Sequence, residues 1–490
     1  RRPPRSTLFP YTTLFRSPPG KKMKEYAALN EAMLEELVAA LGADYVITDP
    51  EKLDMYKTDE EYDPRRFRVP EAVVKPGSAE EVAAVVKLCN KYNVPVTVRG
   101  GGTSLADGAI AVCGGIVLLT ERLNKIIEMD KDAMYMIVEA GVRTVDIQKM
   151  ANEAGLLYAG DPCSAESCLI GGNLATNAGG NKAVRYGVTR NQVYSLEMVT
   201  PTGEIVEVGA RLKKSSTGYC MEQLVMGSEG TLGIITKATL KLLPLCPYRF
   251  DVLAVFDTPD KALELVPMIM QSGINPTSIE YMDNSYVRDT ADFLEFKGAP
   301  HYEDGIYVII TVETYSEDEL DSKMEQLSDL CDEAGSIDVL EADDRIWAMR
   351  RNCQESVSMR SKISLTDDVV VPVNRIAATI KEIMKIGEKY SFPIPAKINA
   401  HIGDGNLHIV LCKCDLEDDV WEKLVHDFHE EVYAYAYAQG GRLAGEHGIG
   451  AKKLSYMEEF TPAGELDLMR KIKLAWDPNL ILNPGKIFNV

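Results

Sequence analysis

Three glycine-rich segments restrict the fold of this chain more than any other feature. Each is expected to be joined to strands; the segments are RGGGTSL at 99–105, IGGNLATNAGGN at 170–181 and GSEGTLGIIT at 227–236. Glycine permits positive φ and lets backbone N–H groups converge on an anion. The first segment is neither a P-loop, because the lysine is missing, nor a GxGxxG turn that opens a long helix. Three such loops would be unusual as turns alone, so we expect them to bind one large, extended ligand, whose identity the loops do not decide.

The second half of the chain carries a histidine motif, HIGDGNLH, between two apolar runs. Its central Asp-Gly predicts a two-residue hairpin turn. Such a turn would place His401 directly opposite His408, with Cβ atoms about 5 Å apart. Two imidazoles in that arrangement form a chelate for a divalent metal, and Glu446 in the later motif GEHGIG offers a carboxylate as third ligand. The alternative is a turn that merely happens to carry histidines, because short motifs often match by chance.

Composition restricts the partners and the compartment. The chain has 490 residues, of which 46% are hydrophobic and 26% charged, which suits a globular protein of two or three domains. A net charge of −21 argues against a nucleic-acid partner. Ten cysteines occur without a CxxC pair, which argues against an iron–sulfur cluster of the usual spacing and predicts a reducing cytoplasm. No apolar run approaches the length of about 18 residues that a membrane span needs, so we expect no transmembrane segment.

The first 22 residues look foreign to the fold. They are basic, lack acidic residues and contain Thr-Leu-Phe twice. They have no apolar core of the kind that a secretory signal requires. A transit peptide would fit this composition, but we favour a non-native or disordered leader, with the natural start at Met23.

Hydrophobic periodicity predicts a mixture of helices and strands. In the first half, strands are expected at 72–76, 94–98, 115–119 and 136–140, and helices at 28–42, after Ser78 and from Thr144. In the second half, strands are expected at 252–256, 306–314, 337–340 and 369–371, and helices at 261–271, 317–333, 375–390 and 416–439. The alternation beyond residue 250 predicts an antiparallel sheet with helices on one face.

The motifs resemble those of a known family. PVTVRGGGTSL, IGGNLATNAGG, RYGVTR and GSEGTLGIIT resemble the FAD-binding part of the vanillyl-alcohol-oxidase/PCMH flavoproteins, and HIGDGNLH and GEHGIG resemble the FAD-linked oxidase C-terminal domain. Six motifs in the expected order identify the chain as similar to the glycolate-oxidase D-subunit, D-lactate and D-2-hydroxyglutarate dehydrogenase group. The resemblance implies an α+β fold: a PCMH-type FAD-binding domain of two α+β subdomains at 23–246, an antiparallel-sheet cap domain for the substrate at 247–440, and a C-terminal helical return to the flavin at 441–490.

The resemblance also implies site residues. FAD would bind without a covalent bond, since the first glycine loop has no histidine. The metal ligands would be His401, His408 and Glu446, with zinc, iron or manganese equally acceptable. His447 would be the general base, and Arg350 would bind the substrate carboxylate. The flavin contacts would be Arg99, Gly100, Gly101, Gly102, Thr103, Ser104, Leu105, Pro162, Gly171, Gly172, Asn173, Thr176, Asn177, Gly180, Glu229, Gly230, Ile235 and Asn483.

Three departures from the family pattern bear on the substrate. Gln354, Thr366 and Val410 stand where the 2-hydroxyglutarate enzymes place a threonine, a lysine and an asparagine. The changes favour a small 2-hydroxy acid, D-lactate in the first place or glycolate, over D-2-hydroxyglutarate. The family resemblance suggests that electrons pass to an electron-transferring flavoprotein or to quinone-linked partner subunits. The sequence leaves a homo-oligomer open.

Other interpretations compete with a catalytic flavoprotein. The chain could be a non-catalytic flavin subunit of a larger electron-transfer complex, or a zinc hydrolase that uses the metal site alone. Arg350 could be an ordinary ion-pair arginine, and His447 a satisfied surface histidine or a neighbour that only supports the site. His426 and His429 are expected to be solvated on the long helix.

Overall fold

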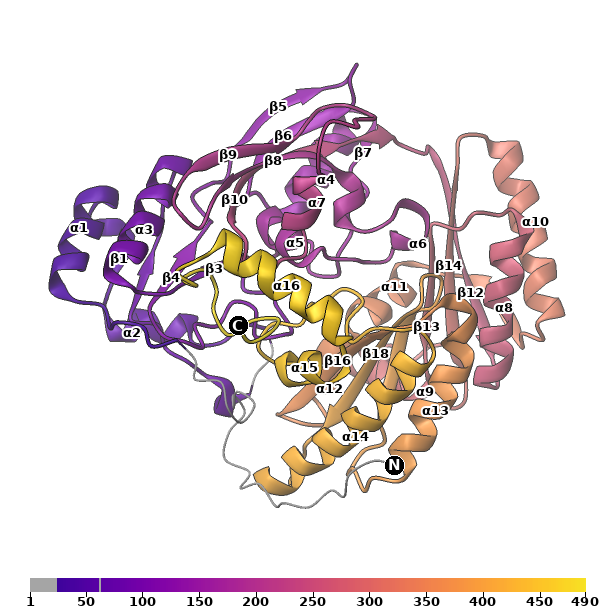
Figure 1. The fold of residues 1–490 in the computed structure, drawn as a ribbon. Coiled ribbons are helices and arrows are strands. Elements are labelled where there is room, and N and C mark those ends of the chain that lie inside the picture. Colours follow the sequence, from indigo (N-terminus) through magenta and orange to yellow (C-terminus); the bar gives the residue numbers. More distant parts are fainter. Residues whose placement is uncertain (1–23, 61–62) are drawn as a thin grey trace.

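The computed structural model describes residues 24–60 and 63–490 (Figure 1). Within them, the strands form sheets of four, five and seven strands and one two-stranded ribbon. The smaller sheets belong to the first half of the chain and the seven-stranded sheet to the second. The proposed leader at 1–22 lies outside the described residues. Mixed helices and sheets of this kind confirm the expected α+β fold class.

The four-stranded sheet has the order β1-β2-β4-β3, in which β4 pairs in parallel with β2 and β3. Two helices, α1 and α3, pack on it through a shared core. Only half of the expected capping box is present: the Ser78 hydroxyl accepts the Glu81 N–H at 3.3 Å, but the Glu81 carboxylate accepts the N–H of Gly77 at 2.7 Å instead of that of Ser78. The elements are α1 (Glu31–Leu41), β1 (Val46–Ile47), α2 (Pro50–Leu53), β2 (Ala72–Val74), α3 (Ala79–Tyr92), β3 (Val96–Arg99) and β4 (Ile116–Leu119).

The five-stranded sheet is antiparallel, with the order β5-β6-β10-β8-β9. Helices α4 and α5 bury their apolar residues against it. The elements are β5 (Ile126–Asp130), β6 (Tyr135–Glu139), α4 (Thr144–Glu153), α5 (Ile170–Thr176), α6 (Ala183–Tyr186), β8 (Val193–Val199), β9 (Ile205–Gly209), α7 (Met221–Val225) and β10 (Ile234–Lys241), and β7 (Leu156–Leu157) pairs with β11 (Leu243–Pro244) as the ribbon.

The seven-stranded sheet is antiparallel throughout, as the sequence predicts, with the order β15-β12-β14-β13-β17-β18-β16. The strand β13 was not expected from the sequence. The strands are β12 (Tyr248–Phe256), β13 (Ser278–Met282), β14 (Ile306–Thr314), β15 (Asp338–Glu341), β16 (Ser364–Val370), β17 (Lys397–His401) and β18 (Asn406–Cys412).

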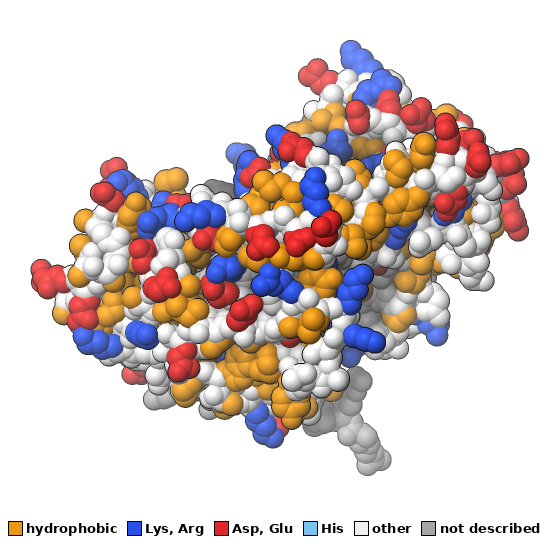
Figure 2. Space-filling view, turned by 90° about the horizontal axis from the view of Figure 1, so that it is seen from above, with side chains coloured by type: hydrophobic (Ala, Val, Ile, Leu, Met, Phe, Trp, Pro, Cys, Tyr) orange, Lys and Arg blue, Asp and Glu red, His pale blue; other side chains and the backbone are white. Residues whose placement is uncertain are grey.

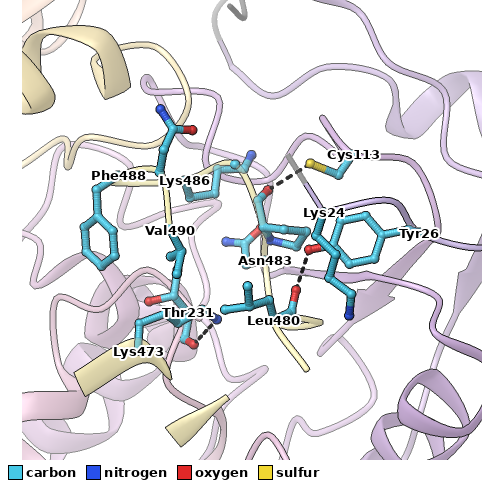
Figure 3. A pocket seen from close by; sticks show the side chains of 13 residues that line it. Lys24, Tyr26, Cys113, Thr231, Lys473, Leu480, Asn483, Lys486, Phe488 and Val490 are labelled. Atoms are coloured by element: carbon cyan, nitrogen blue, oxygen red, sulfur yellow. Dashed lines mark hydrogen bonds between the residues drawn. The ribbon is translucent and has the colours of Figure 1, made fainter. Parts of the chain in front are cut away.

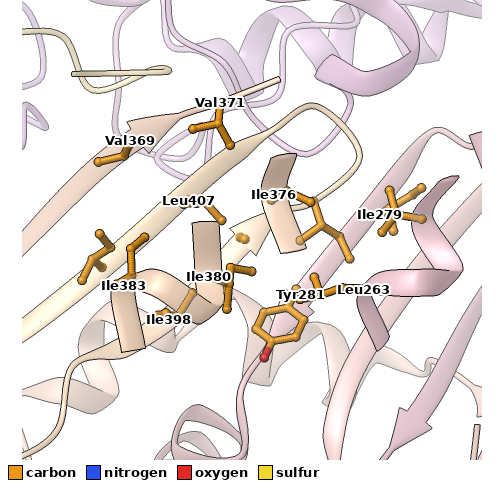
Figure 4. Packing of buried hydrophobic residues seen from close by; sticks show 14 of the residues in the cluster. Leu263, Ile279, Tyr281, Val369, Val371, Ile376, Ile380, Ile383, Ile398 and Leu407 are labelled. Atoms are coloured by element: carbon orange, nitrogen blue, oxygen red, sulfur yellow. The ribbon is translucent and has the colours of Figure 1, made fainter. Parts of the chain in front are cut away.

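Helices cover both faces of this sheet, so the expectation of helices on one face is wrong. On one face Ile279, Tyr281 and Leu407 pack with Ile380 of α13 (Figure 4), and α8, α10 and α14 extend that core. On the other face α9, α11 and α12 form a second core. Every residue of β14 is buried, as expected for a strand covered on both sides. The helices are α8 (Pro259–Ser272), α9 (Asn284–Phe293), α10 (Glu317–Glu333), α11 (Asp344–Arg351), α12 (Cys353–Val357), α13 (Ile376–Glu388) and α14 (Asp418–Ala438).

The C-terminal residues return to the first half of the chain. After α15 (Leu454–Phe460) and α16 (Ala463–Trp476), Leu482 pairs in parallel with Val96 of β3, and the Val96 carbonyl accepts the Asn483 N–H at 2.8 Å. Ile481 and Leu482 thereby join the core of the four-stranded sheet. This return places Asn483 beside the glycine-rich segments.

The surface agrees with the acidic composition. Figure 2 shows acidic and basic side chains interspersed on the face that it presents, with the basic ones scattered instead of forming one continuous patch. No helix among the described residues combines enough length with enough hydrophobicity to cross a bilayer.

Candidate functional site

The two motif histidines lie on neighbouring strands of the seven-stranded sheet. His401 ends β17 and pairs with Asn406, whereas His408 on β18 pairs with Asn399. The connection therefore contains four residues, 402–405, and the predicted direct opposition of His401 and His408 is wrong. The rings are nevertheless diagonal neighbours on one face, with centroids 5.2 Å apart.

The turn itself explains the shifted register. The His401 carbonyl accepts the N–H groups of Asp404 at 3.2 Å and Gly405 at 3.3 Å, which closes a one-turn α-turn instead of a two-residue turn. Gly405 has φ +95°, and a Cβ on it would lie 2.0 Å from the Val371 carbonyl oxygen. Only glycine fits this position.

Glu446 completes a cluster of possible metal ligands. Its Oε1 lies 2.9 Å from Nε2 of His408 and 3.3 Å from Nε2 of His401. One ligand atom from each of the three residues falls within 4.8 Å of the others. Burial opposes ionisation of Glu446, but the two imidazoles outweigh it and hold the pKa of this carboxyl well below its ordinary value. Two imidazoles and an ionised carboxylate form a donor set that divalent zinc, iron or manganese accepts.

In each of the two imidazoles, the nitrogen that points away from Glu446, Nδ1, contacts a buried acceptor. Nδ1 of His401 lies 2.8 Å from Oε1 of Glu280, and Nδ1 of His408 lies 3.1 Å from Oδ1 of Asn399. An acceptor at Nδ1 favours the tautomer that leaves the Nε2 lone pair free for a cation. Both rings therefore present Nε2 toward Glu446.

Arg350, on α11, is buried and paired with Glu280. Its Nε donates to Oε2 of Glu280 at 2.9 Å, and its Nη2 lies 2.7 Å from the same oxygen. Burial opposes ionisation of Glu280, yet His401 and Arg350 lower the pKa of this carboxyl below its ordinary value. Glu280 thus links Arg350 to His401. The ion pair that the sequence offered as the alternative for Arg350 is present. Binding of a substrate carboxylate by Arg350 stays a prediction.

His447 lies against the same cluster. Its ring stacks on that of His408, with centroids 4.8 Å apart and planes 13° apart. Its Nε2 lies 3.9 Å from Oε1 of Glu446. Burial lowers the pKa of His447 to about 4, although Asp368 acts in the opposite direction. The ring is therefore neutral at physiological pH.

His429 differs from the sequence prediction, whereas His426 is exposed as expected. The His429 ring is buried, stacks on Tyr433 with centroids 5.1 Å apart, and has its Nε2 3.4 Å from Oδ2 of Asp367 on β16. It lies on the apolar face of α14 with Val425, Phe428 and Val432, which packs against the sheet. The expectation that His429 is solvated is wrong for that reason.

The glycine-rich segments converge, as the sequence predicts. A Cβ built on Gly100 would lie 3.7 Å from the Gly172 nitrogen. The Gly227 N–H donates to the Leu174 carbonyl at 3.1 Å, so the third segment lies beside the second. The Asn483 amide donates to the Glu229 carbonyl at 2.6 Å and adds the C-terminal return. The expected flavin residues 99–105, 171–180, 229–235 and 483 lie on these segments, and Pro162 lies beside Gly180.

Part of the second segment is not a loop. Residues 170–176 form α5, which Asn177 ends in the left-handed conformation. The Asn173 amide donates to the Thr144 hydroxyl at 2.6 Å, so this side chain serves the protein. Other polar atoms remain available: Ser228 Oγ, Asn181 Oδ1 and Asn483 Oδ1 are buried without a hydrogen-bond partner among the described residues. Orphaned polar atoms next to the glycine-rich segments fit a polar cofactor.

A small cavity lies beside the C-terminal return (Figure 3). It has a volume of about 60 Å³ and is lined by Lys24, Tyr26, Cys113, Thr231 and residues of the C-terminal segment. The Tyr26 hydroxyl donates to the Leu480 carbonyl at 2.5 Å, and Lys473 Nζ donates to the Thr231 carbonyl at 2.7 Å. None of the histidines lines it, so this cavity is separate from the metal-ligand cluster.

Three residues of the site were missed by sequence reasoning: Glu280, Asn399 and Asp368. Glu280 and Asp368 are acids inside strands that consist mainly of apolar and β-branched residues, SIEYM and SLTDDVV. A buried charge must be paired. An acid in the middle of such a strand was therefore a usable signal for a neighbouring cation or N–H cluster.

Comparison with known proteins identifies the family. Residues 70–209 match the model of an FAD binding domain, and residues 248–487 match that of the C-terminal domain of FAD linked oxidases. The D-lactate dehydrogenase of Anaerostipes hadrus is 40% identical over 430 residues, which cover 85% of this chain and 89% of that protein. The chain belongs to the FAD-linked oxidase family. It is an FAD-linked oxidoreductase.

Other members of the FAD-linked oxidase family cover most of the chain as well. The glycolate oxidase subunit GlcD of Bacillus subtilis is 33% identical, with 87% of this chain and 90% of that protein covered. The D-2-hydroxyglutarate dehydrogenase of Stutzerimonas stutzeri is 31% identical, with 93% and 99% covered.

Solved structures share the fold. That of p-cresol methylhydroxylase with bound substrate has a TM-score of 0.76 at 17% identity and covers 93% of this chain and 96% of its own. An alkyldihydroxyacetonephosphate synthase has a TM-score of 0.74 at 20% identity, with 94% and 87% covered. These two likenesses support the PCMH-type fold.

Proposed function

We propose that this flavoprotein oxidises a small D-2-hydroxy acid, D-lactate in the first place or glycolate, to the corresponding 2-oxo acid. The observation that carries the proposal is the convergence of His401, His408 and Glu446, with ligand atoms within 4.8 Å of one another. Relatives named D-lactate dehydrogenase and glycolate oxidase support the substrate class.

The three ligands would hold a divalent cation, and the glycine-rich segments would hold FAD without a covalent bond. A divalent cation supplies acidity to a bound hydroxyl, as it does to a bound water. Bound FAD would supply the redox chemistry, as the acceptor for the hydride of the substrate Cα. The remaining tasks, which are to accept the hydroxyl proton and to hold the carboxylate, belong to side chains of the chain.

His447 is the proposed proton acceptor. Burial lowers its pKa to about 4, so the imidazole is neutral but weakly basic, and it would depend on the cation to acidify the substrate hydroxyl. It stacks on His408 and lies 3.9 Å from the Glu446 carboxylate, so it adjoins the position where the substrate hydroxyl would bind. A general base acts on a proton within about 2.6–3.2 Å, or through one water, so the substrate hydroxyl would have to bind at that distance from the ring.

Arg350 is the proposed carboxylate-binding residue. Its contacts with Glu280 use Nε and Nη2, and Nη1 makes no hydrogen bond to any described residue. The buried ion pair keeps the guanidinium charged and fixes its plane, which leaves one amine for a single carboxylate oxygen.

The neighbourhood of Thr366 supports a substrate with one carboxylate. The Thr366 hydroxyl donates to Oε1 of Gln354 at 2.7 Å, so the two residues satisfy each other. Lys397 adjoins Val410 in the ladder, but its ammonium group is bound to Asp289. A second carboxylate would therefore find no uncommitted cation from these residues, which makes D-2-hydroxyglutarate the less favoured substrate.

The reduced flavin needs an external electron acceptor in this proposal. The sequence has no CxxC pair and no nicotinamide-binding fingerprint. An electron-transferring flavoprotein or quinone-linked partner subunits would meet the need. All ten cysteines are free, which fits a cytoplasmic location. The competing proposal is a non-catalytic flavin subunit, and it predicts no turnover with any hydroxy acid.

A substrate panel with an artificial dye acceptor tests the proposal. Purified protein, assayed for FAD and metal, is supplied with D-lactate, L-lactate, glycolate and D-2-hydroxyglutarate. Dye reduction should be fastest with D-lactate or glycolate and should require the metal. Absence of turnover with every acid in flavin-loaded, metal-loaded protein would favour the non-catalytic subunit.

A further inference from the structure

The segment that carries Glu446 and His447 has an irregular backbone. Residues 445–450 lie outside helices and strands. Gly448 has φ +82°, and a Cβ on it would lie 2.8 Å from Oε1 of Glu229. Because no regular ladder satisfies the backbone N–H groups of this segment, other acceptors must do so. The identity of these acceptors decides what fixes the proposed ligand and base.

Asp368 accepts the N–H groups of the first half of the segment. It lies on β16, opposite His408 in the ladder, and is fully buried. Its Oδ1 accepts the Gly445 N–H at 2.8 Å, and its Oδ2 accepts those of Glu446 at 2.9 Å and His447 at 2.7 Å. One carboxylate thus ties the segment to the strand next to His408.

Asp368 is itself held in place from behind. Its carbonyl oxygen accepts a hydrogen bond from Lys453 Nζ at 2.6 Å. The same ammonium group lies 2.7 Å from Oδ1 of Asp367, which points to the opposite face of the sheet. Pairing of β16 with β18 also anchors the backbone that carries Asp368, independently of the 445–450 segment.

Glu229 accepts the N–H groups of the second half. Its Oε1 accepts the Ile449 N–H at 2.7 Å and its Oε2 that of Gly450 at 2.8 Å. Glu229 belongs to the third glycine-rich segment, and its own N–H donates to the Ala175 carbonyl at 2.8 Å. The carboxylate expected to bind the cofactor thus binds the segment that carries Glu446.

We propose that Asp368 and Glu229 are positioning residues that fix Glu446 and His447 from two sides, one from the seven-stranded sheet and one from the flavin-binding half. The inference rests on the proposed function, because it assigns both carboxylates to the metal and proton chemistry of the same cluster. Hydrogen bonds from N–H groups to a carboxylate are stronger than neutral ones. Five such bonds on six consecutive residues leave the Glu446 carboxylate little freedom to leave His401 and His408.

Asp368→Asn and Glu229→Gln test the inference, because each keeps the size of the side chain but presents an amide to backbone N–H groups. Asp283→Asn is the matched control. Asp283 is a buried carboxylate that accepts the N–H groups of Tyr286 at 2.9 Å and Ile398 at 2.7 Å away from the 445–450 segment. Zinc is titrated into metal-stripped, flavin-loaded protein, with flavin content and thermal midpoint measured alongside.

Both test variants should bind zinc about 10- to 100-fold more weakly, as replacement of residues that support metal ligands commonly does. Asp368→Asn should keep its flavin, and Asp283→Asn should keep the wild-type zinc affinity even where its thermal midpoint falls. If one test variant fails to fold, the other supplies the same measurement.

Two results would overturn the inference, and they are distinguishable. Wild-type zinc affinity in a folded test variant, or an equal loss in Asp283→Asn, removes the positioning role while the proposed function stands. A wild-type protein that binds no zinc, iron or manganese removes the metal site of the proposed function, and the positioning role with it.

Discussion

The Glu446 carboxylate lies 2.9 Å from Nε2 of His408, although His408 belongs to β18 of the seven-stranded sheet and Glu446 to an irregular segment after α14. Each is fixed by its own buried acceptor: Asn399 holds the far side of the imidazole, and Asp368 holds the backbone of Glu446. The protein itself therefore holds the two groups beside each other. Its chemistry depends on the neighbours that the following experiments change.

His447→Ala separates proton transfer from binding. The variant should keep FAD and metal, because Glu446 and both ligand imidazoles remain. Its rate of flavin reduction by D-lactate should fall about 10²- to 10⁴-fold, the usual contribution of a general base. Anaerobic stopped-flow absorbance measures that rate. His426→Ala, on the exposed side of α14, is the control, and an unchanged rate in His447→Ala would remove the assigned role.

Thr366→Lys tests the preference for a monocarboxylate. The change breaks the hydrogen bond with Gln354 and adds a cation where a second carboxylate would lie. The ratio of kcat/KM for D-2-hydroxyglutarate to that for D-lactate should rise at least about tenfold, which corresponds to about 1.4 kcal/mol. Thr366→Ser keeps the hydroxyl and should keep the wild-type ratio. An unchanged ratio in the lysine variant would show that the second carboxylate of D-2-hydroxyglutarate does not bind beside residue 366.

Arg350→Met tests the buried ion pair. Loss of the guanidinium leaves Glu280 charged and buried, and removing one partner of such a pair costs about 3–5 kcal/mol of unfolding free energy. Urea unfolding measures this loss. The double variant Arg350→Met with Glu280→Gln should recover part of the stability but none of the turnover. If the single variant is as stable as wild type, Arg350 and Glu280 do not form the pair described here.

Because His429 is buried, we expect the protein to lose stability in mild acid. Burial lowers its pKa in the folded chain to about 4, whereas the ordinary value is 6.5. As pH falls through this window, the unfolded chain takes up the proton first, so the free energy of unfolding falls between pH 6.5 and about 4. The difference between these two pKa values corresponds to about 3 kcal/mol of unfolding free energy.

Unfolding curves between pH 4 and pH 7 measure that slope. His429→Phe removes the titrating group while it keeps a ring on Tyr433, so its slope should be smaller over the same range. Equal slopes in the two proteins would show that other groups titrate there.

Much of the architecture could be predicted because the hydrophobic pattern of the sequence was strong. The bounds of β14 and α10 agree with the expected ranges, since a continuous apolar run and a long amphipathic helix have clear ends. The convergence of the glycine-rich segments also followed from their composition. The approach of Glu446 to the histidines was expected only from family resemblance, because nothing in the local sequence fixes a contact between distant segments.

The failures have physical causes. The strand β13 was not predicted because Glu280 interrupts its apolar run. The same acid links Arg350 to His401 in the structure. The hairpin register was wrong because an α-turn at His401 competes with a two-residue Asp-Gly turn. Helices on both faces of the sheet, and the burial of His429, depend on tertiary packing that no short window of sequence contains.

Metal analysis of flavin-loaded protein tests the central claim most directly. Elemental analysis alongside the flavin absorbance should give one divalent zinc, iron or manganese ion per FAD in wild-type protein. The ion should be lost, with FAD retained, when His401 and His408 are both replaced by alanine. Active wild-type protein without a stoichiometric divalent ion, or full metal content in the double variant, would contradict the account.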